Sequence, residues 1–209
     1  MSKELLECLK NITISGLPLI LPPVGAGLLT LANECFNSSA KARQDKWNEE
    51  IVKKFTLLDS HFEQQILETS NFASLLASAQ RGALEDVEED KISLYANAVI
   101  NAIKNEKLDD TKKHIFLNIL RDCTLLHTKV LKEISKSKGP RIDMSRGICV
   151  INELLSELRR KFKDFELLEV VLKNLSENHL INIRVNNLFE TEPTTITDFG
   201  KEFLNFIEE

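Results

Sequence analysis

The sequence has few of the residues that interrupt helices. It contains 7 glycines and 5 prolines among 209 residues, and six of these twelve fall within residues 16–27. The remainder is dominated by leucine, isoleucine, lysine, glutamate and asparagine, most of which helices accommodate at little cost. The scarcity of breakers outside one short segment therefore predicts a mainly α-helical protein.

Cysteines in metal-binding patterns are lacking as well. The four cysteines lie far apart, no C-x-x-C pair occurs, and no histidine stands near a cysteine at zinc spacing. Scattered thiols of this kind fit a reducing compartment, where they behave as small buried apolar groups. We therefore expect a cytoplasmic protein without a metal site, and we leave membrane association open because of the segment described below.

An excess of positive charge and the familiar catalytic motifs are also missing. The net charge is −5, which excludes a general nucleic-acid coat. No H-E-x-x-H, G-x-S-x-G or Gly-rich phosphate loop occurs, and the four histidines fall on separate segments. We therefore expect a protein that is not an enzyme and has no catalytic residue or cofactor. An enzyme with an unrecognised site remains an alternative.

One apolar segment stands out near the start of the sequence. No charged residue occurs from Asn11 to Asn33, and this run exceeds the length of about 20 residues that a membrane-spanning helix needs. Because Pro22-Pro23 and Gly25 interrupt it, we expect a helical hairpin within residues 1–36 rather than a single rod. Burial in a core or oligomer interface and contact with a membrane both remain open. The candidate residues are Leu19, Ile20, Leu21, Pro22, Pro23, Leu28 and Leu29.

A long helix is expected next, in a self-associating helical domain spanning residues 37–122. Asn37-Ser38-Ser39 resembles a helix N-cap, so the helix is predicted over residues 40–68. Apolar residues spaced by threes and fours form a seam typical of a helix that faces a partner helix. We therefore expect a homo-oligomer, whereas the sequence does not identify any other protein partner. The predicted interface residues are Trp47, Ile51, Phe55, Leu58 and Phe62.

An acidic run, Glu85–Asp90, separates the two helices that are expected to follow. Clustered carboxylates can hold a metal ion, but they also favour a helix N-terminus, where they complement the dipole. We prefer the second interpretation. The helix after the run should bury Ile92, Tyr95, Ala96, Val99 and Ile103, and a further helical stretch is expected to break near Thr124.

Residues 123–209 follow a different pattern. Three helices, an alternating strand from Leu180, a return strand at residues 194–197 and a final helix over residues 199–207 are expected. This order, with the spacing Thr197-x-x-Gly200-x-x-Phe203, resembles the wing and closing helix of bacterial winged-helix domains. The resemblance implies a winged-helix-like domain with a small β-hairpin.

Winged helices often bind DNA, so the charge of the expected recognition helix, residues 164–178, matters. It carries four acidic residues against Lys173 alone, and such a surface repels phosphates. We therefore do not expect nucleic acid as a partner, although a winged-helix transcription regulator remains an alternative. The candidate anion contact beside this helix consists of Arg159, Arg160 and Lys161.

The chain as a whole resembles a known family. An apolar Pro/Gly segment precedes a long charged helix, a helix containing Leu94-Tyr95-Ala96-Asn97-Ala98-Val99, the stretches Phe116–Leu120 and Leu125–His127, and the winged-helix-like region. This combination is similar to the bacterial abortive-infection alpha-type proteins, a domain of unknown function, and to related phage-defence or stress proteins. The resemblance implies a bacterial cytosolic or membrane-associated defence protein without a defined active site, and it carries no catalytic residues. Our leading hypothesis is accordingly a non-enzymatic, self-associating helical interaction protein whose N-terminal hairpin either fills the oligomer core or contacts a membrane.

Overall fold

The computed structural model describes part of the chain. The described residues are 26–56, 58, 70–105, 107–136, 158, 160–162, 164–182 and 195–208, with the side chains of residues 26–38, 70 and 165 excepted.

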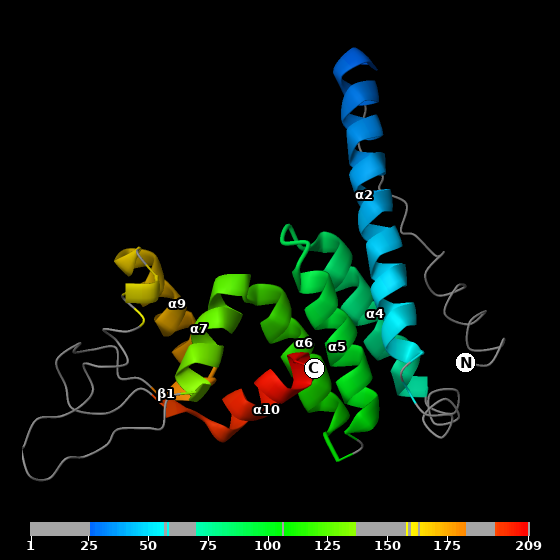
Figure 1. Ribbon diagram of the computed structural model, residues 1–209. Coiled ribbons are helices and arrows are strands. Elements are labelled where there is room, and N and C mark those ends of the chain that lie inside the picture. Colours follow the sequence, from blue (N-terminus) through cyan, green and yellow to red (C-terminus); the bar gives the residue numbers. More distant parts are fainter. Residues whose placement is uncertain are drawn as a thin grey trace, which may run out of the picture. The chain divides into compact units, whose positions relative to one another are not determined.

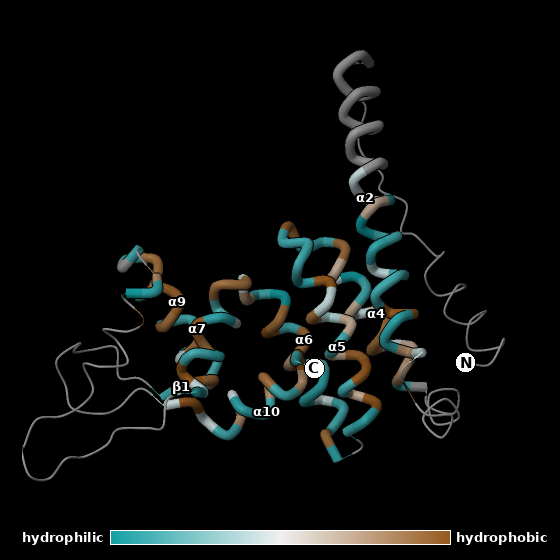
Figure 2. The backbone as a smooth tube through the Cα atoms, viewed as in Figure 1, coloured by the Kyte–Doolittle hydropathy of each residue, from teal (hydrophilic) through white to brown (hydrophobic). Residues whose placement is uncertain are grey.

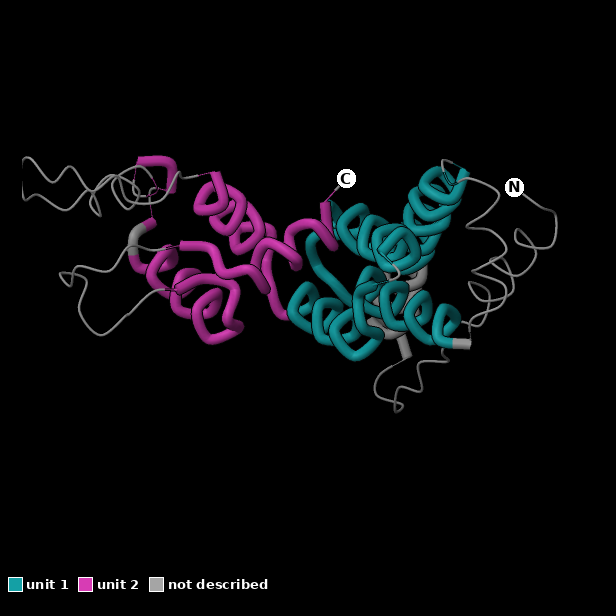
Figure 3. The backbone as a smooth tube through the Cα atoms, turned by 90° about the horizontal axis from the view of Figure 1, so that it is seen from below, with its two compact units in different colours: residues 1–121 teal, residues 122–209 magenta. Residues whose placement is uncertain are grey.

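The chain divides into two compact units, residues 1–121 (unit 1) and residues 122–209 (unit 2) (Figure 3). The described residues form seven helices and one two-stranded antiparallel sheet. The prediction of a mainly helical protein with a small antiparallel sheet is therefore confirmed. The finer division into residues 1–36, 37–122 and 123–209 stays a prediction.

Unit 1 contains four described helices: α2 (Ala26–Phe55), α4 (Ser70–Glu85), α5 (Lys91–Lys104) and α6 (Asp110–Asp122) (Figure 1). Helices α2, α4 and α5 pack against one another. Their sequences alternate between hydrophilic and hydrophobic stretches (Figure 2), as amphipathic helices around a shared core require. The buried apolar side chains include Trp47, Ile51 and Phe55 on α2, Leu75, Leu76, Ala79 and Ala83 on α4, and Ile92, Tyr95, Ala96 and Val99 on α5.

The predicted boundaries of the long helix are wrong at both ends. Helix α2 runs without interruption through Asn37–Ser39, where a cap was expected. An N-cap forms only where the preceding residues are not helical, and the residues from Leu28 to Phe36 contain no breaker, so the helix continues. It ends at Phe55, and the Thr56 hydroxyl donates to the Lys53 carbonyl at 2.6 Å. Most of the predicted continuation to residue 68 lies outside the described residues.

The predicted break near Thr124 is confirmed. Helix α6 ends at Asp122, and α7 (Leu125–Lys136) begins after Cys123 and Thr124. The first backbone bond of the new helix runs from the Thr128 amide to the Thr124 carbonyl at 3.3 Å. Thr124 therefore occupies the N-cap position, as its preference for helix starts suggests.

Unit 2 combines α7 with α9 (Phe165–Glu177), β1 (Ile181–Asn182), β2 (Thr195–Ile196) and α10 (Asp198–Ile207). The two strands pair antiparallel, with Ile181 opposite Ile196 and Asn182 opposite Thr195. Helix α7 packs against α9, α10 and β2. The core includes Val130, Leu131 and Ile134 from α7, Leu168, Val171, Leu172 and Leu175 from α9, and Phe203, Leu204, Phe206 and Ile207 from α10.

The spacing Thr197-x-x-Gly200-x-x-Phe203 has a clear structural basis. Thr197 is the N-cap of α10, because its side-chain oxygen accepts from the Gly200 amide at 2.8 Å. The same hydroxyl lies 2.7 Å from the His179 carbonyl and 3.1 Å from the Leu180 carbonyl, to either of which it can donate. A Cβ at Gly200 would overlap the Leu180 carbonyl, and Phe203 is fully buried one turn later. The three residues thus cap α10 and seat it against the start of β1.

Helix α9 ends in a Schellman motif. The His179 amide donates to the Ser176 carbonyl and the Leu180 amide donates to the Leu175 carbonyl, both at 2.9 Å. His179 adopts the left-handed conformation with φ = 58°, which is more often occupied by glycine at this position. The motif turns the chain sharply from α9 into β1.

Candidate functional site

His127 is a buried histidine. A catalytic role would require one of its ring nitrogens to be free to exchange a proton. Its Nδ1 accepts from the Thr124 amide at 3.1 Å and lies 2.8 Å from the Thr124 hydroxyl. Its Nε2 lies 3.4 Å from the side-chain amide of Asn174 on α9. The Thr124 amide can only donate, so Nδ1 is the accepting nitrogen of the ring. Both ring nitrogens therefore face groups of the chain itself, Thr124 on one side and the Asn174 side chain on the other.

The position of His127 explains this role. It is the third residue of α7 after the cap Thr124, which is the position where a glutamate of a capping box reaches back to the cap amide. The imidazole replaces the carboxylate of that motif and links α7 to α9. The burial of His127 agrees with a structural role in packing α7.

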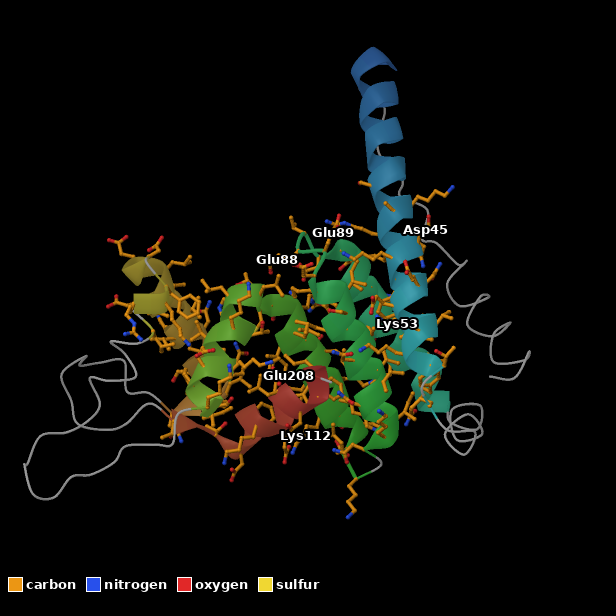
Figure 4. The ribbon with its side chains drawn as sticks, viewed as in Figure 1. Asp45, Lys53, Glu88, Glu89, Lys112 and Glu208 are labelled. Atoms are coloured by element: carbon orange, nitrogen blue, oxygen red, sulfur yellow. The ribbon has the colours of Figure 1, made fainter. Side chains whose placement is uncertain are left out.

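The acidic run Glu85–Asp90 forms the connection between α4 and α5. Glu88 and Glu89 lie in this connection (Figure 4), and Glu89 is 3.4 Å from the Lys46 ammonium on α2. The described residues include no group of three or more histidine, cysteine, aspartate or glutamate side chains able to hold a metal ion. Asp90 of the run is the N-cap residue of α5, as expected for a carboxylate that complements the dipole, although its side chain makes no cap hydrogen bond and the first turn itself holds no acidic residue.

Arg43 holds the connection against α2. Its guanidinium donates to the Leu84 carbonyl at 3.3 Å, to the Val87 carbonyl at 3.0 Å and to the Asp86 carbonyl. The Leu84 carbonyl belongs to the last turn of α4, where helix carbonyls lack partners within the helix, and the other two carbonyls follow directly after the helix. A cation here also complements the negative end of the helix dipole.

Lys91 holds the other end of the connection and is itself buried, with 1% of its surface exposed. Its ammonium forms an ion pair with Asp86 and donates to the Arg121 carbonyl at 3.3 Å, near the end of α6. It also lies 5.8 Å from the centroid of the Tyr95 ring. A buried charge persists only when it is paired and hydrogen-bonded, and these contacts meet that requirement. The acidic run therefore supplies a structural ion pair.

The predicted interface residues lie in the core of unit 1. Trp47, Ile51, Phe55 and Leu58 are buried within the single chain, and Phe62 lies outside the described residues. The ring of Phe55 packs edge-on against Phe72, with 6.0 Å between centroids. The seam thus faces elements of its own chain, and self-association through these residues stays a prediction.

The predicted anion contact is described in part. Arg159 lies outside the described residues, whereas Arg160 and Lys161 are exposed. Lys161 forms an ion pair with Glu133 of α7, and Lys136 lies 3.0 Å from the same carboxylate. Hydrogen bonds from Lys161 and then Lys136 hold the pKa of Glu133 below its ordinary value. Lys161 therefore has an internal carboxylate partner that an external anion would have to replace.

The predicted apolar hairpin lies mostly outside the described residues, including Leu19, Ile20, Leu21, Pro22 and Pro23. Leu28 and Leu29 belong to the first turns of α2, in which only the backbone is described. Among the helices that the structure describes, none is both long enough and apolar enough to span a bilayer.

Helix α9 exposes two apolar residues that sequence reasoning did not single out. Leu167 and Val170 are 48% and 54% exposed, and they fall between the buried positions of the helix. Glu166, Lys173 and Glu177 are also exposed, and Lys173 lies 3.8 Å from Glu177. We name these five residues the α9 outer face. The signal in the sequence was their phase, because neither apolar residue fits the periodicity of the core stripe.

Comparisons with models of protein families, with curated proteins and with solved structures found no match to this chain.

Proposed function

We propose that the protein is a non-enzymatic helical interaction protein that self-associates. The observation that carries the proposal is the length of α2. It has 30 residues, whereas α4 has 16 and α5 has 14. At about 1.5 Å per residue, α2 is about 45 Å long and roughly twice as long as either partner helix. Its described buried residues all lie between Trp47 and Phe55, and its first turns project past α4 and α5 (Figure 1).

The projecting part, residues 26–41, is here named the α2 arm. By sequence it contains Leu28, Leu29, Leu31, Cys35 and Phe36, and its first charged residue is Glu34. An apolar helix gains most of its stability from packing, so such an arm favours a partner surface. A second copy of the chain is the partner that we propose, with a membrane surface as the alternative.

The resemblance to abortive-infection alpha-type proteins supports a role in bacterial phage defence or stress. The resemblance rests on an apolar N-terminal segment, a long helix and a winged-helix-like region that occur in one chain. Within this proposal, the arm mediates assembly or reversible membrane contact, and unit 2 serves protein recognition.

Light scattering coupled to size-exclusion chromatography tests self-association. We expect an oligomer at micromolar concentration and a lower mass for the variant Leu28→Gln/Leu29→Gln. The matched control is Ala42→Gln, which changes an exposed residue of the same helix. A strict monomer for the unmodified chain would overturn the proposal.

Flotation with liposomes tests the alternative partner. If the arm contacts a membrane, the unmodified chain and Ala42→Gln float with the lipid, whereas Leu28→Gln/Leu29→Gln remains at the bottom of the gradient. Equal distribution of all three proteins would remove the membrane contact from the proposal.

A DNA-binding winged helix is the second candidate. It is supported by the order of α7, the helical residues Leu158 and Arg160–Lys161, α9, the two strands and α10. It predicts salt-dependent binding to duplex DNA that Arg160→Glu/Lys161→Glu abolishes. Absence of any mobility shift at low salt would reject it.

A further inference from the structure

The α9 outer face exposes two apolar side chains on one helix. Leu167 and Val170 are about half exposed on a helix whose opposite side is tightly buried. They stand three residues apart, so their side chains are neighbours on the helix surface. Together the two side chains form one hydrophobic contact point rather than two separate ones.

Asn174 fixes the direction in which this pair lies. Residues 167, 170 and 174 follow the spacing i, i+3, i+7, which places them in one stripe along the helix. The Asn174 side chain contacts His127 near the start of α7. The apolar pair therefore lies on the same flank of α9 as Asn174, one and two turns nearer the start of the helix.

The charges around the pair select the partner. Four carboxylates belong to α9 and its cap, at residues 164, 166, 169 and 177, and Lys173 is their single positive counterpart in this segment. Glu177 lies 3.8 Å from Lys173, and Asp164 caps the helix by accepting from the Leu167 amide, which leaves Glu166 and Glu169 without a base on the same helix. Phosphate backbones and anionic lipid headgroups are repelled by such a surface, whereas cationic side chains are attracted to it.

We propose that the α9 outer face is a docking site for a basic amphipathic helix of a partner protein. The partner's apolar residues, spaced i, i+3, i+4, contact Leu167 and Val170. Its lysines and arginines lie opposite Glu166 of this face and the other exposed carboxylates of α9. This is the helix-on-surface mode of peptide recognition, in which a few apolar anchors give affinity and flanking charges give specificity. The inference extends the proposed interaction function to a second surface and does not depend on assembly through the α2 arm.

Fluorescence anisotropy with labelled peptides and the full chain tests the proposal. The probe is a peptide of about 18 residues with leucine at positions i, i+3, i+4 and i+7 and lysine elsewhere. Two control peptides carry glutamate in place of lysine, or the same residues in scrambled order. We expect the lysine peptide to bind and both controls to bind at least about tenfold more weakly.

Two variants separate apolar docking from simple charge attraction. We expect Leu167→Ser/Val170→Ser to weaken binding of the lysine peptide about tenfold while all charges are retained. Val87→Ser is the matched control, because Val87 is an apolar residue of unit 1 with 84% exposure, and it should bind as the unmodified chain does. Circular dichroism establishes that each variant retains its helical content.

The contrary outcomes are equally specific. Equal binding by Leu167→Ser/Val170→Ser and the unmodified chain would reduce the effect to charge and overturn the proposal. Binding of a DNA duplex that this variant abolishes would assign the face to nucleic acid instead. A monomeric chain that still binds the lysine peptide would reject self-association but keep this inference.

Discussion

Lys91 is the residue on which the connection between α4 and α5 depends most. Its ammonium joins Asp86 to the carbonyl of Arg121, and solvent hardly reaches it. We expect Lys91→Met to lower the free energy of unfolding of unit 1 by about 3 kcal/mol, because it leaves the Asp86 carboxylate half-buried without its ammonium. Urea denaturation followed by tryptophan fluorescence measures this change.

The double variant Asp86→Asn/Lys91→Met is the control for this prediction. It removes both charges, so much of the lost stability should return if an unpaired carboxylate is the cause. A single variant with unchanged stability would show that the ion pair contributes nothing.

His179 occupies a backbone conformation that a side chain resists. The left-handed region costs a residue with a Cβ roughly 1–2 kcal/mol, and glycine avoids this cost while losing more entropy on folding. We expect His179→Gly to stabilise unit 2 by about 0.5 kcal/mol, measured by thermal unfolding with circular dichroism. His179→Ala keeps the Cβ and should give no gain. A loss of stability in the glycine variant would contradict this explanation.

For single residues, the sequence predicted which side chains are buried more successfully than which groups they contact. Four residues of the predicted stripe, Ile92, Tyr95, Ala96 and Val99, are buried, because helical period determines which side of a helix is apolar, whereas the fifth, Ile103, is only half-buried. The roles of Arg43 and Lys91 were missed. Arg43 contacts carbonyls more than forty positions away, and no local pattern marks such a contact.

The start of α10 is a small element in which three residues act together. Gly200 brings the helix within contact of the Leu180 carbonyl, and Thr197 caps the helix from the adjacent position. We expect Gly200→Ala to destabilise unit 2 by about 2 kcal/mol, because its Cβ overlaps backbone that cannot move without disturbing β1. Thermal unfolding followed by circular dichroism is the measurement.

Gly82 offers a comparison for this prediction. A Cβ there would lie 2.6 Å from the Tyr95 ring, so its neighbour is a side chain rather than backbone. Gly82→Ala should therefore be tolerated better than Gly200→Ala. If Gly82→Ala proves more destabilising than Gly200→Ala, the Tyr95 ring is held more rigidly than the start of β1.

Glu133 connects α7 to the helical residues around Lys161. Hydrogen bonds from Lys161 and Lys136 lower the pKa of Glu133 from its ordinary value of 4.5. A lowered pKa means that the stabilisation is complete above pH 4.5 and is lost as the pH falls through the value of the folded state. We expect the difference in melting temperature between the unmodified chain and Glu133→Gln to disappear on acidification from pH 6 to about pH 3. A difference that is independent of pH would contradict the ion pair.

Elements were predicted well where a breaker or turn residue marks their ends. The break at Thr124, the strand pair and the final helix have local signals, and each is present in the structure. The limits of α2 were not predictable in this way. The cap-like residues Asn37–Ser39 fit inside a helix as well as at its start, and only the surrounding helix decides between the two. The exposure of Leu167 and Val170 also depends on which elements pack against α9.

The two units give the whole molecule two separate cores, and its single tryptophan lies in one of them. Trp47 is fully buried in unit 1, so its fluorescence reports the unfolding of that unit, whereas circular dichroism reports both. We expect Lys91→Met to shift the fluorescence transition, and Gly200→Ala to shift mainly the dichroism transition. Identical shifts of both signals in both variants would show that the chain unfolds as one cooperative unit.

The uninterrupted course of α2 has a mechanical consequence. From Leu28 to Phe55 the helix contains neither glycine nor proline, so it has no built-in hinge between the arm and the core. A surface that binds the arm therefore acts on a rigid helix that also carries Trp47. Between the arm and Trp47, Arg43 donates hydrogen bonds to the α4–α5 connection. Binding at the arm should therefore displace α2 within the core of unit 1, and Trp47 should report this displacement as a change in its fluorescence emission.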